Sequence, residues 1–278
     1  MRTVPSRGVD RPKDVPTCAD AQPIDATDSR AVLALFGAIC DRTTTLLAAN
    51  DDWSASGQRD GQYSVDVEID AACLAMLYEA GFAVLSEESG RTGPDGEVAP
   101  THVVVVDPLD GSTNAALGLP WCATALCLVS NGVPTVAMVA NLRTGTRYTA
   151  VLGGGAQRNG HPIIAGSMER LEDAIIAVNA RPPATFRPAQ YRSMGATALD
   201  IASVAAVGGF HGTIDFDEDR MGVWDYLAAI TIVREAGGVA ADALGRDLIT
   251  LDHNARRRPV TAASQGLLDE LLAAGRSS

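Results

Sequence analysis

The sequence predicts an α/β protein with an antiparallel first half and an alternating strand–helix second half. Residues 121–155 carry apolar β-type runs that are separated by Asn131-Gly132 and Thr144-Gly145, and such turn dipeptides are typical of a meander of antiparallel strands. In the second half, short apolar runs alternate with stretches of helical spacing. Together the two patterns indicate sheets with helices packed on them.

Composition divides the chain into three parts. Residues 1–25 are rich in proline and charge and have no apolar core, which predicts a disordered tail and argues against a secretory signal. Residues 26–155 are expected to form an N-terminal α+β domain that carries the acidic motifs. Residues 156–278 are expected to form a C-terminal α/β domain that completes the site. The glycine-rich stretch GGGAQRNGHPI is the expected seam.

The first half begins with helical spacing of apolar residues over about residues 28–50. A polar, glycine-containing loop follows, and Asp70 is then the expected N-cap of a helix over residues 71–81. Two strands are expected next, FAVLS at residues 82–86 and HVVVV at residues 102–106.

The second half contains three strand–helix pairs. The strands are AIIAVN, GTIDF and PVTAAS, and the helices are ATALDIASVAAVGG, WDYLAAITIVREAGG and QGLLDELLAAG. The glycine pairs that follow two of these helical stretches are natural C-terminal stops.

The charge of the chain limits the partners that it can bind. The formal net charge is −12, so general binding to nucleic acid or to an anionic membrane is not expected. If the substrate is an anion, bound cations must offset the local field. The five cysteines form no CxxC pair and are expected to be buried thiols in a reducing cytoplasm. The longest apolar run, residues 115–129, is interrupted by Pro120 and is too short for a membrane span.

One stretch concentrates the candidate chemistry, VVVVDPLDGSTN at residues 103–114. A continuous valine run indicates a strand that is covered on both faces, and a tight turn after it would bring Asp107 and Asp110 together. Two close carboxylates repel each other unless a cation joins them, and Mg²⁺ prefers such oxygen ligands. Gly111 and Ser112 would offer amides for a phosphate at a helix start. The alternative is an ordinary turn without chemistry.

Other acidic residues have similar positions. Glu87 and Glu88 follow the strand FAVLS, and Asp225 stands after Trp224 at the start of a helix, where a negative charge suits the helix dipole. Each also has a purely structural reading, either a solvated loop or a first-turn acid.

Four motifs in order resemble the inositol monophosphatase superfamily of Mg²⁺-dependent phosphatases. DPLDGSTN at residues 107–114 is similar to the pattern D-P-[IL]-D-G-[ST]-x-N of that family. SEES at residues 86–89, WD at 224–225 with EAGG at 235–238, and GAQRNG at 155–160 resemble its other elements. The resemblance covers nearly the whole chain from about residue 30. It implies a layered αβαβα fold, a homodimer and two Mg²⁺ ions, with a weak third.

The resemblance also implies a role for each ligand. Glu87, Asp107 and the Leu109 carbonyl would hold the first Mg²⁺. Asp107, Asp110 and Asp225 would hold the second. Asp70 aligns with an acid that helps the third ion, but the lysine that the family carries upstream of it is missing.

Catalytic and substrate roles follow from the same resemblance. Glu87 with the Ser112 hydroxyl would orient and deprotonate the attacking water near Asp107, and the Gly111 and Ser112 amides would bind phosphate oxygens. The expected substrate contacts are Gly195, Ala196, Thr197 and Glu218.

The expected activity is hydrolysis of a small-molecule phosphate ester of a polyol, cyclitol or sugar. Histidinol phosphate, fructose 1,6-bisphosphate and 3′-phosphoadenosine nucleotides are alternatives within the superfamily, and a catalytically silent binding homologue is the alternative outside it. No basic pocket for a second phosphate is evident from the sequence. The four histidines lack zinc spacing, and the arginine run at residues 256–258 is expected to be a solvated loop.

Overall fold

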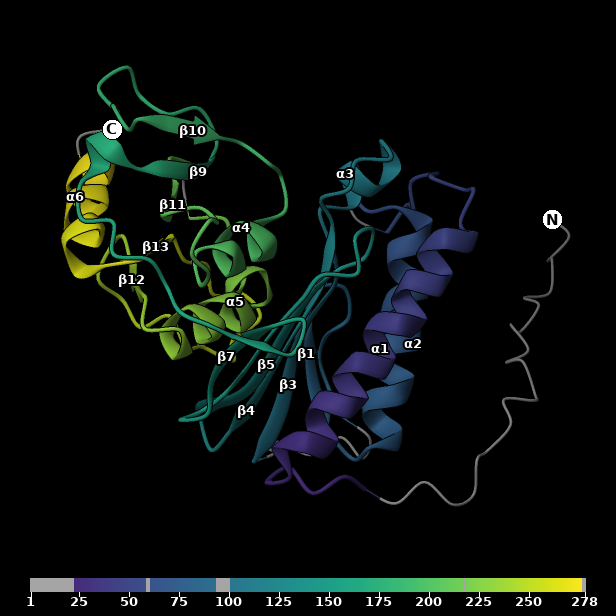
Figure 1. The fold of residues 1–278 in the computed structure, drawn as a ribbon. Coiled ribbons are helices and arrows are strands. Elements are labelled where there is room, and N and C mark those ends of the chain that lie inside the picture. The colour runs from purple at the N-terminus through teal and green to yellow at the C-terminus, as the bar shows by residue number, and fades with distance from the viewer. Residues whose placement is uncertain (1–22, 59–60, 94–100, 218, 277–278) are drawn as a thin grey trace, which may run out of the picture.

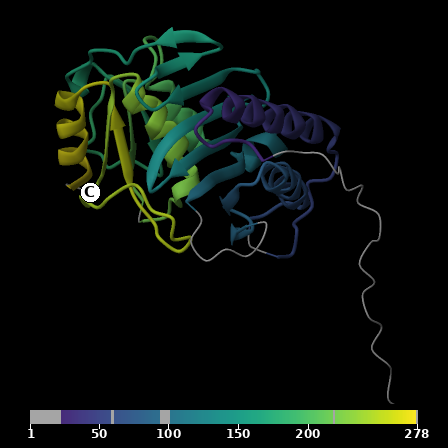
Figure 2. The same cartoon turned by 90° about the horizontal axis from the view of Figure 1, so that it is seen from below.

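The computed structural model describes residues 23–58, 61–93, 101–217 and 219–276, which form five layers (Figure 1). The first layer holds α1 (Ser29–Ala49) and α2 (Ser64–Glu79), and it packs on one face of an eight-stranded sheet. The third layer holds α4 (Thr197–Ser203) and α5 (Val223–Glu235), between that sheet and a five-stranded one. The fifth is α6 (Gln265–Arg276). The predicted αβαβα layering is confirmed, and Figure 2 shows α1 and α6 on opposite sides of the sheets.

The eight-stranded sheet continues the predicted meander past its expected end. Its order is β2-β1-β3-β4-β5-β6-β7-β8, with only β1 and β3 parallel to each other. The glycine-rich stretch expected to be a seam forms β7 and β8, so the boundary proposed at residue 155 falls within this sheet. The strands are β1 (Ala83–Ser86), β2 (Gly90–Thr92), β3 (His102–Asp110), β4 (Ala123–Ser130), β5 (Val133–Asn141), β6 (Arg147–Val151), β7 (Gly155–Arg158) and β8 (His161–Ile163).

The valine run is buried on both faces, as its sequence indicates. Val104 and Val106 pack in the core formed with α1 and α2, whereas Val103 and Val105 pack in the core formed with α4 and α5. Successive strand residues point to opposite faces, so a strand between two helical layers requires apolar residues at every position.

The second sheet has the order β10-β9-β11-β13-β12. The sequence predicted three of its strands, and the short β10 and β12 were missed. The second half also contains a 3₁₀ turn at Leu171–Asp173. The five strands are β9 (Ile175–Asn179), β10 (Gln190–Arg192), β11 (Gly212–Asp215), β12 (Val239–Asp242) and β13 (Pro259–Ala262).

The start of α2 corrects one prediction. The helix begins at Ser64, where the Tyr63 amide donates to the Asp66 carboxylate. Asp70 is therefore inside the helix and does not cap it. By contrast, α1 begins as predicted, because the Asp28 carboxylate accepts from the amides of Arg30 and Ala31.

Within the described part of the chain, α1 is the helix whose length and mean hydropathy of 1.4 would allow it to cross a membrane. Seven of its residues are buried, and five of these belong to the core that it shares with α2 and the first sheet. A core helix of a soluble protein passes the same test of length and hydropathy.

Candidate active site

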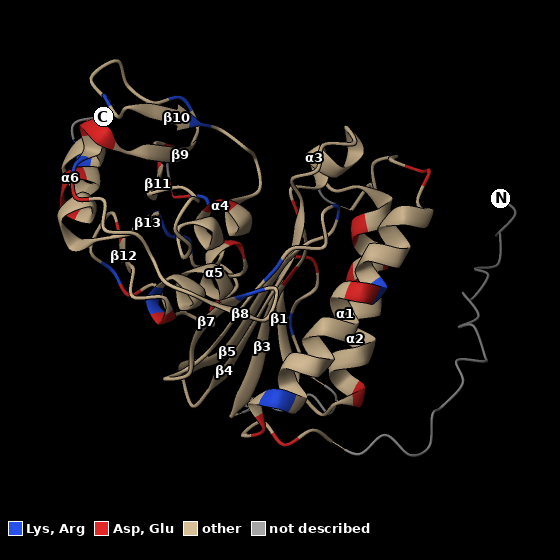
Figure 3. Ribbon diagram, viewed as in Figure 1, with Lys and Arg blue, Asp and Glu red and all other residues tan. Residues whose placement is uncertain are grey.

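Three carboxylates from three elements meet beside the end of β1. Glu87 follows β1, Asp107 belongs to β3, and Asp225 lies in the first turn of α5. One oxygen from each lies within 4.8 Å of the others. Figure 3 shows acidic segments in this region. The parallel pairing of β1 with β3 brings two of these side chains together, since the Glu87 amide donates to the Val106 carbonyl (3.2 Å).

The backbone between Asp107 and Asp110 differs from the predicted turn. The strand continues through both residues, and its pairing with β4 shifts register between them. The Leu109 amide donates to Asp107 Oδ1 (3.1 Å), and the Thr124 hydroxyl donates to the Pro108 carbonyl (2.9 Å). An irregularity of this kind re-aims side chains without ending a strand.

Asp110 faces the N-terminus of α4. Its Oδ1 accepts from the Thr197 amide (3.2 Å) and its Oδ2 from the Ala198 amide (2.7 Å). It is not one of the three clustered carboxylates. Each of its oxygens keeps a second lone pair, so it stays a candidate ligand.

Burial and mutual repulsion dominate the electrostatics. Burial raises the pKa of Asp107 well above its usual range, and the charges of Glu87, Asp110 and Asp225 raise it further. Burial likewise raises the pKa of Asp225, with Glu87 adding to the effect, and raises that of Asp110 to about 7. Oxygen donors that are buried and repel one another match a hard divalent cation, so the residues present fit the Mg²⁺ that the family implies.

Asp70 lies behind the turn that carries Glu87. It is 5% exposed, and its two oxygens accept from the hydroxyls of Ser86 (2.5 Å) and Ser89. Burial raises its pKa. The next acid of the turn, Glu88, accepts from the Gln62 side-chain amide.

The segment expected to bind phosphate docks on the segment expected to bind substrate. Gly111 has φ 77° and caps the short helix α3 (Ser112–Ala116). A Cβ at Gly111 would lie 3.0 Å from the Ala196 Cβ and 3.0 Å from the Trp121 carbonyl oxygen, so only glycine fits there. The Asn114 side chain donates to the carbonyls of Trp121 (2.8 Å) and Met194 (2.7 Å).

The structure adds a group that sequence reasoning missed. The His253 ring packs against Trp224, with ring centres 4.7 Å apart and an interplanar angle of 31°, and its Nε2 lies 3.3 Å from the Glu87 carbonyl oxygen. The Arg256 guanidinium lies 5.2 Å from the centre of the Trp224 ring. The expectation of a solvated arginine loop is therefore wrong for Arg256. Nothing in the sequence links a histidine at 253 to a glutamate at 87.

Glu218, the expected contact to the substrate alcohol, lies outside the described residues. Its neighbour Asp219 is paired with both Nη atoms of Arg246 (2.6 and 2.9 Å). Arg246 also binds the buried Asp242 through Nε (2.7 Å) and Nη2 (2.9 Å). One guanidinium thus joins the loop before α5 to the end of β12.

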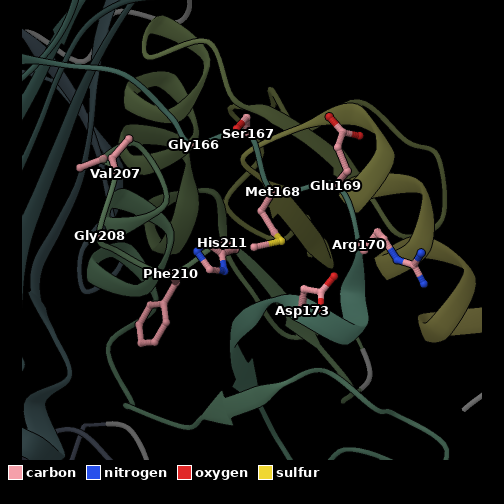
Figure 4. A pocket seen from close by; sticks show the side chains of 11 residues that line it. Gly166, Ser167, Met168, Glu169, Arg170, Asp173, Val207, Gly208, Phe210 and His211 are labelled. Atoms are coloured by element: carbon pink, nitrogen blue, oxygen red, sulfur yellow. The ribbon is translucent and has the colours of Figure 1, made fainter.

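A cavity of about 420 Å³ lies away from the carboxylates. It is lined by residues 166–170, 206–208, 210 and 211 and by Asp173 (Figure 4). None of the clustered acids reaches it. A second cavity, of about 360 Å³, is lined by Arg158, Arg192, Trp121 and Tyr148, among others.

The sequence and the fold of this chain are similar to those of known proteins. The model of the Inositol monophosphatase family matches residues 20–278. The inositol-1-monophosphatase ImpA of Mycolicibacterium smegmatis is 30% identical over 270 residues, which cover 90% of this chain and 93% of that protein. The Nus factor SuhB of Escherichia coli is 31% identical over 239 residues, covering 78% of this chain and 86% of that protein. The solved structure of the extragenic suppressor protein suhB from Bartonella henselae has 26% identity and a TM-score of 0.75, covering 89% of this chain and 99% of that one.

These relatives define a class of phosphatases and SuhB-type proteins that is built on one layered fold. The chain belongs to the inositol monophosphatase family. Membership supports a phosphatase, in a family that is generally metal-dependent.

Proposed function

We propose that the protein is a Mg²⁺-dependent phosphomonoesterase that acts on a small polyol, cyclitol or sugar phosphate. The observation that carries the proposal is the meeting of Glu87, Asp107 and Asp225 within 4.8 Å. Family membership supports the same reading. We further propose that the protein acts as a homodimer, as the family resemblance implies, and in the cytoplasm, where its five cysteines would remain thiols.

In this proposal, the carboxylates hold the cations. Glu87, Asp107 and the Leu109 carbonyl would bind one Mg²⁺, and Asp107 with Asp110 and Asp225 would bind a second. A weak third would lie near Asp70. When bound, a pair of such cations stabilises charge on the entering and departing oxygens and lowers the pKa of the attacking water.

The side chains of the site divide the remaining tasks. The Glu87 carboxylate would accept the proton of the attacking water while the Ser112 hydroxyl orients that water. The amides of Gly111 and Ser112 would hold phosphate oxygens, and their position is fixed because Gly111 packs against Ala196. The substrate alcohol would lie toward Gly195, Thr197 and Glu218.

The decisive assay measures phosphate release from a panel of monoesters with and without Mg²⁺. We expect Asp107→Asn to reduce the rate at least about a hundredfold, because it removes a charged ligand from the site. Asp269→Asn on the exposed face of α6 is the control and should be unaffected. No Mg²⁺-dependent release from any ester would refute the proposal and favour a silent binding homologue.

A sugar bisphosphate is the second candidate substrate, because the structure contains a basic cavity that the sequence did not reveal. Arg158 and Arg192 line it together with Trp121, and the Trp121 carbonyl accepts from Asn114 of the phosphate-binding motif. Arginine side chains that line one cavity suit the binding of a second phosphate. If this candidate is correct, Arg158→Gln and Arg192→Gln should raise KM for a bisphosphate in the panel while leaving KM for monophosphates unchanged.

A further inference from the structure

The side chains of His253, Trp224 and Arg256 form a stack beside the carboxylate cluster. His253 lies against Trp224 and reaches the Glu87 carbonyl, and Arg256 lies over the same indole ring. Trp224 directly precedes Asp225. The stack therefore contacts the turn that presents Glu87 and the helix start that presents Asp225.

Two features fix the guanidinium of Arg256. Its Nη1 donates to the carbonyls of His253 (2.7 Å) and Ala255 (3.0 Å), both in its own loop. Its Cζ lies 5.2 Å from the centre of the indole of Trp224, a residue that is only 4% exposed. A guanidinium over a desolvated aromatic ring gains more from the cation–π contact than an exposed one does.

The positive charge of Arg256 affects the binding of ions at the acidic cluster. Arg256 lies over the Trp224 ring, and Trp224 directly precedes Asp225, so the Arg256 charge lies near the cluster formed by Glu87, Asp107 and Asp225. A fixed positive charge beside a site for both a cation and an anion acts on the two with opposite sign. It repels the divalent cation and attracts the phosphate.

We propose that Arg256, held by the Trp224–His253 stack, is a positioning cation of this site that strengthens binding of phosphate and weakens binding of the divalent cation. The proposal rests on the proposed function and adds to it a residue that no motif marks. Arg256 would thereby lower the affinity of the site for the divalent cation and raise its affinity for the phosphate of the substrate.

The test measures two binding constants by calorimetry on the full chain. The first is for Mg²⁺ alone, and the second is for inorganic phosphate at saturating Mg²⁺. In Arg256→Gln and Arg256→Met we expect Mg²⁺ to bind about threefold to tenfold tighter and phosphate to bind weaker by a similar factor. Arg256→Lys, which keeps the charge, should lie close to the unmutated protein in both constants.

Arg257→Gln is the matched control, because its side chain contacts the backbone of Asp247 and Arg256 instead of the stack. It should change neither constant. Opposite changes in the two constants support the proposal, since a merely disordered loop would weaken both. Changes in the same direction, or none beyond twofold, would overturn it. If Arg256→Gln does not fold, the comparison of Arg256→Lys with Arg256→Met decides.

The two proposals can fail separately. If no ester is hydrolysed but the constants move in opposite directions, the phosphomonoesterase assignment is wrong and the role of Arg256 holds. If hydrolysis depends on Asp107 but the constants do not move, only the role of Arg256 is wrong.

Discussion

At the scale of single residues, buried carboxylates are the defining feature of this protein. Those of the candidate site lie close together and raise one another's pKa through the repulsion of their charges. Asp200 is different, because it is 3% exposed on α4 and its Oδ1 accepts from the Trp121 indole (2.9 Å). Burial raises its pKa to about 8. Its ionisation therefore opposes folding.

Asp200→Asn should make the protein more stable at alkaline pH. The pKa of Asp200 is higher in the folded state than in the unfolded state, so its contribution to stability is complete below about pH 4 and is lost as the pH rises through about 8. Urea unfolding should show a gain on the order of 2 kcal/mol at pH 9 and little change at pH 5. An equal gain at both pH values would show that ionisation is not the cause.

Gly111→Ala should damage both the fold and the activity. A side chain at φ 77° is strained, and the new methyl group would meet Ala196 and the Trp121 carbonyl at 3.0 Å. We expect a loss of about 1–3 kcal/mol of unfolding free energy and a lower kcat. Gly118→Ala is the control, since its φ is 72° but its Cβ position is open. Similar losses in both variants would mean that backbone strain alone is responsible.

At the scale of elements, the sequence predicts those strands and helices whose pattern agrees with their packing. The valine strand, α5 and α6 were all predicted from local pattern. The start of α2 was not, because YSVDVEID alternates apolar and acidic residues with the period of a strand. Packing against α1 and the sheet overrides that pattern. The short β10 and β12 depend on pairing with β9 and β13, which no local signal encodes.

The Arg246 bridge should stabilise the loop that leads into α5. Removing the guanidinium leaves the Asp242 carboxylate, whose side chain is fully buried, without its ion pair. Hydrogen bonds from Arg246 and Arg258 hold the pKa of Asp242 below its usual range against burial. Arg246→Ala should therefore cost about 1–3 kcal/mol at pH 7, and less as Asp242 is protonated in acid.

Chemical denaturation at pH 7 and at about pH 2–3, where a carboxyl whose pKa lies below its usual range of about 3.9 becomes protonated, checks this expectation. Arg234→Ala is the matched control, because Arg234 makes only an exposed contact to the Ala240 carbonyl (3.3 Å). A cost for Arg246→Ala that does not fall in acid would contradict the assignment to Asp242.

At the scale of the whole molecule, the candidate site joins distant parts of the chain. The sequence motifs predicted that Glu87, Asp107 and Asp225 act together, and the structure brings them together. The sequence could not predict that Asp110 faces the amides of Thr197 and Ala198, or that Arg256 stacks on Trp224, because these contacts depend on how the layers are packed. Local sequence motifs reveal which residues can act as ligands, but they do not reveal which side chains and amides surround those residues.

Divalent cations should stabilise the whole fold. A ligand that binds only the folded state adds about 2.7 kcal/mol at a concentration one hundred times its Kd. Mg²⁺ should raise Tm, and a chelator should lower it to the metal-free value. Asp107→Asn should raise Tm in the absence of metal, because it removes a buried charge that burial and its neighbours disfavour, and should abolish the response to Mg²⁺. A metal-free variant that melts below the unmutated protein would contradict this account.

Because α5 packs between the two sheets, we expect that the protein cannot be cut into two fragments that fold separately. All but three of its thirteen residues are buried, and its core extends from Leu85 and Val105 on one side to Leu248 and Ala263 on the other. A fragment that ends after β8 would leave one complete face of the valine strand open to water, which favours aggregation. Two fragments cut between β8 and β9 should regain solubility only when they are produced together, as complementary halves of one folding unit.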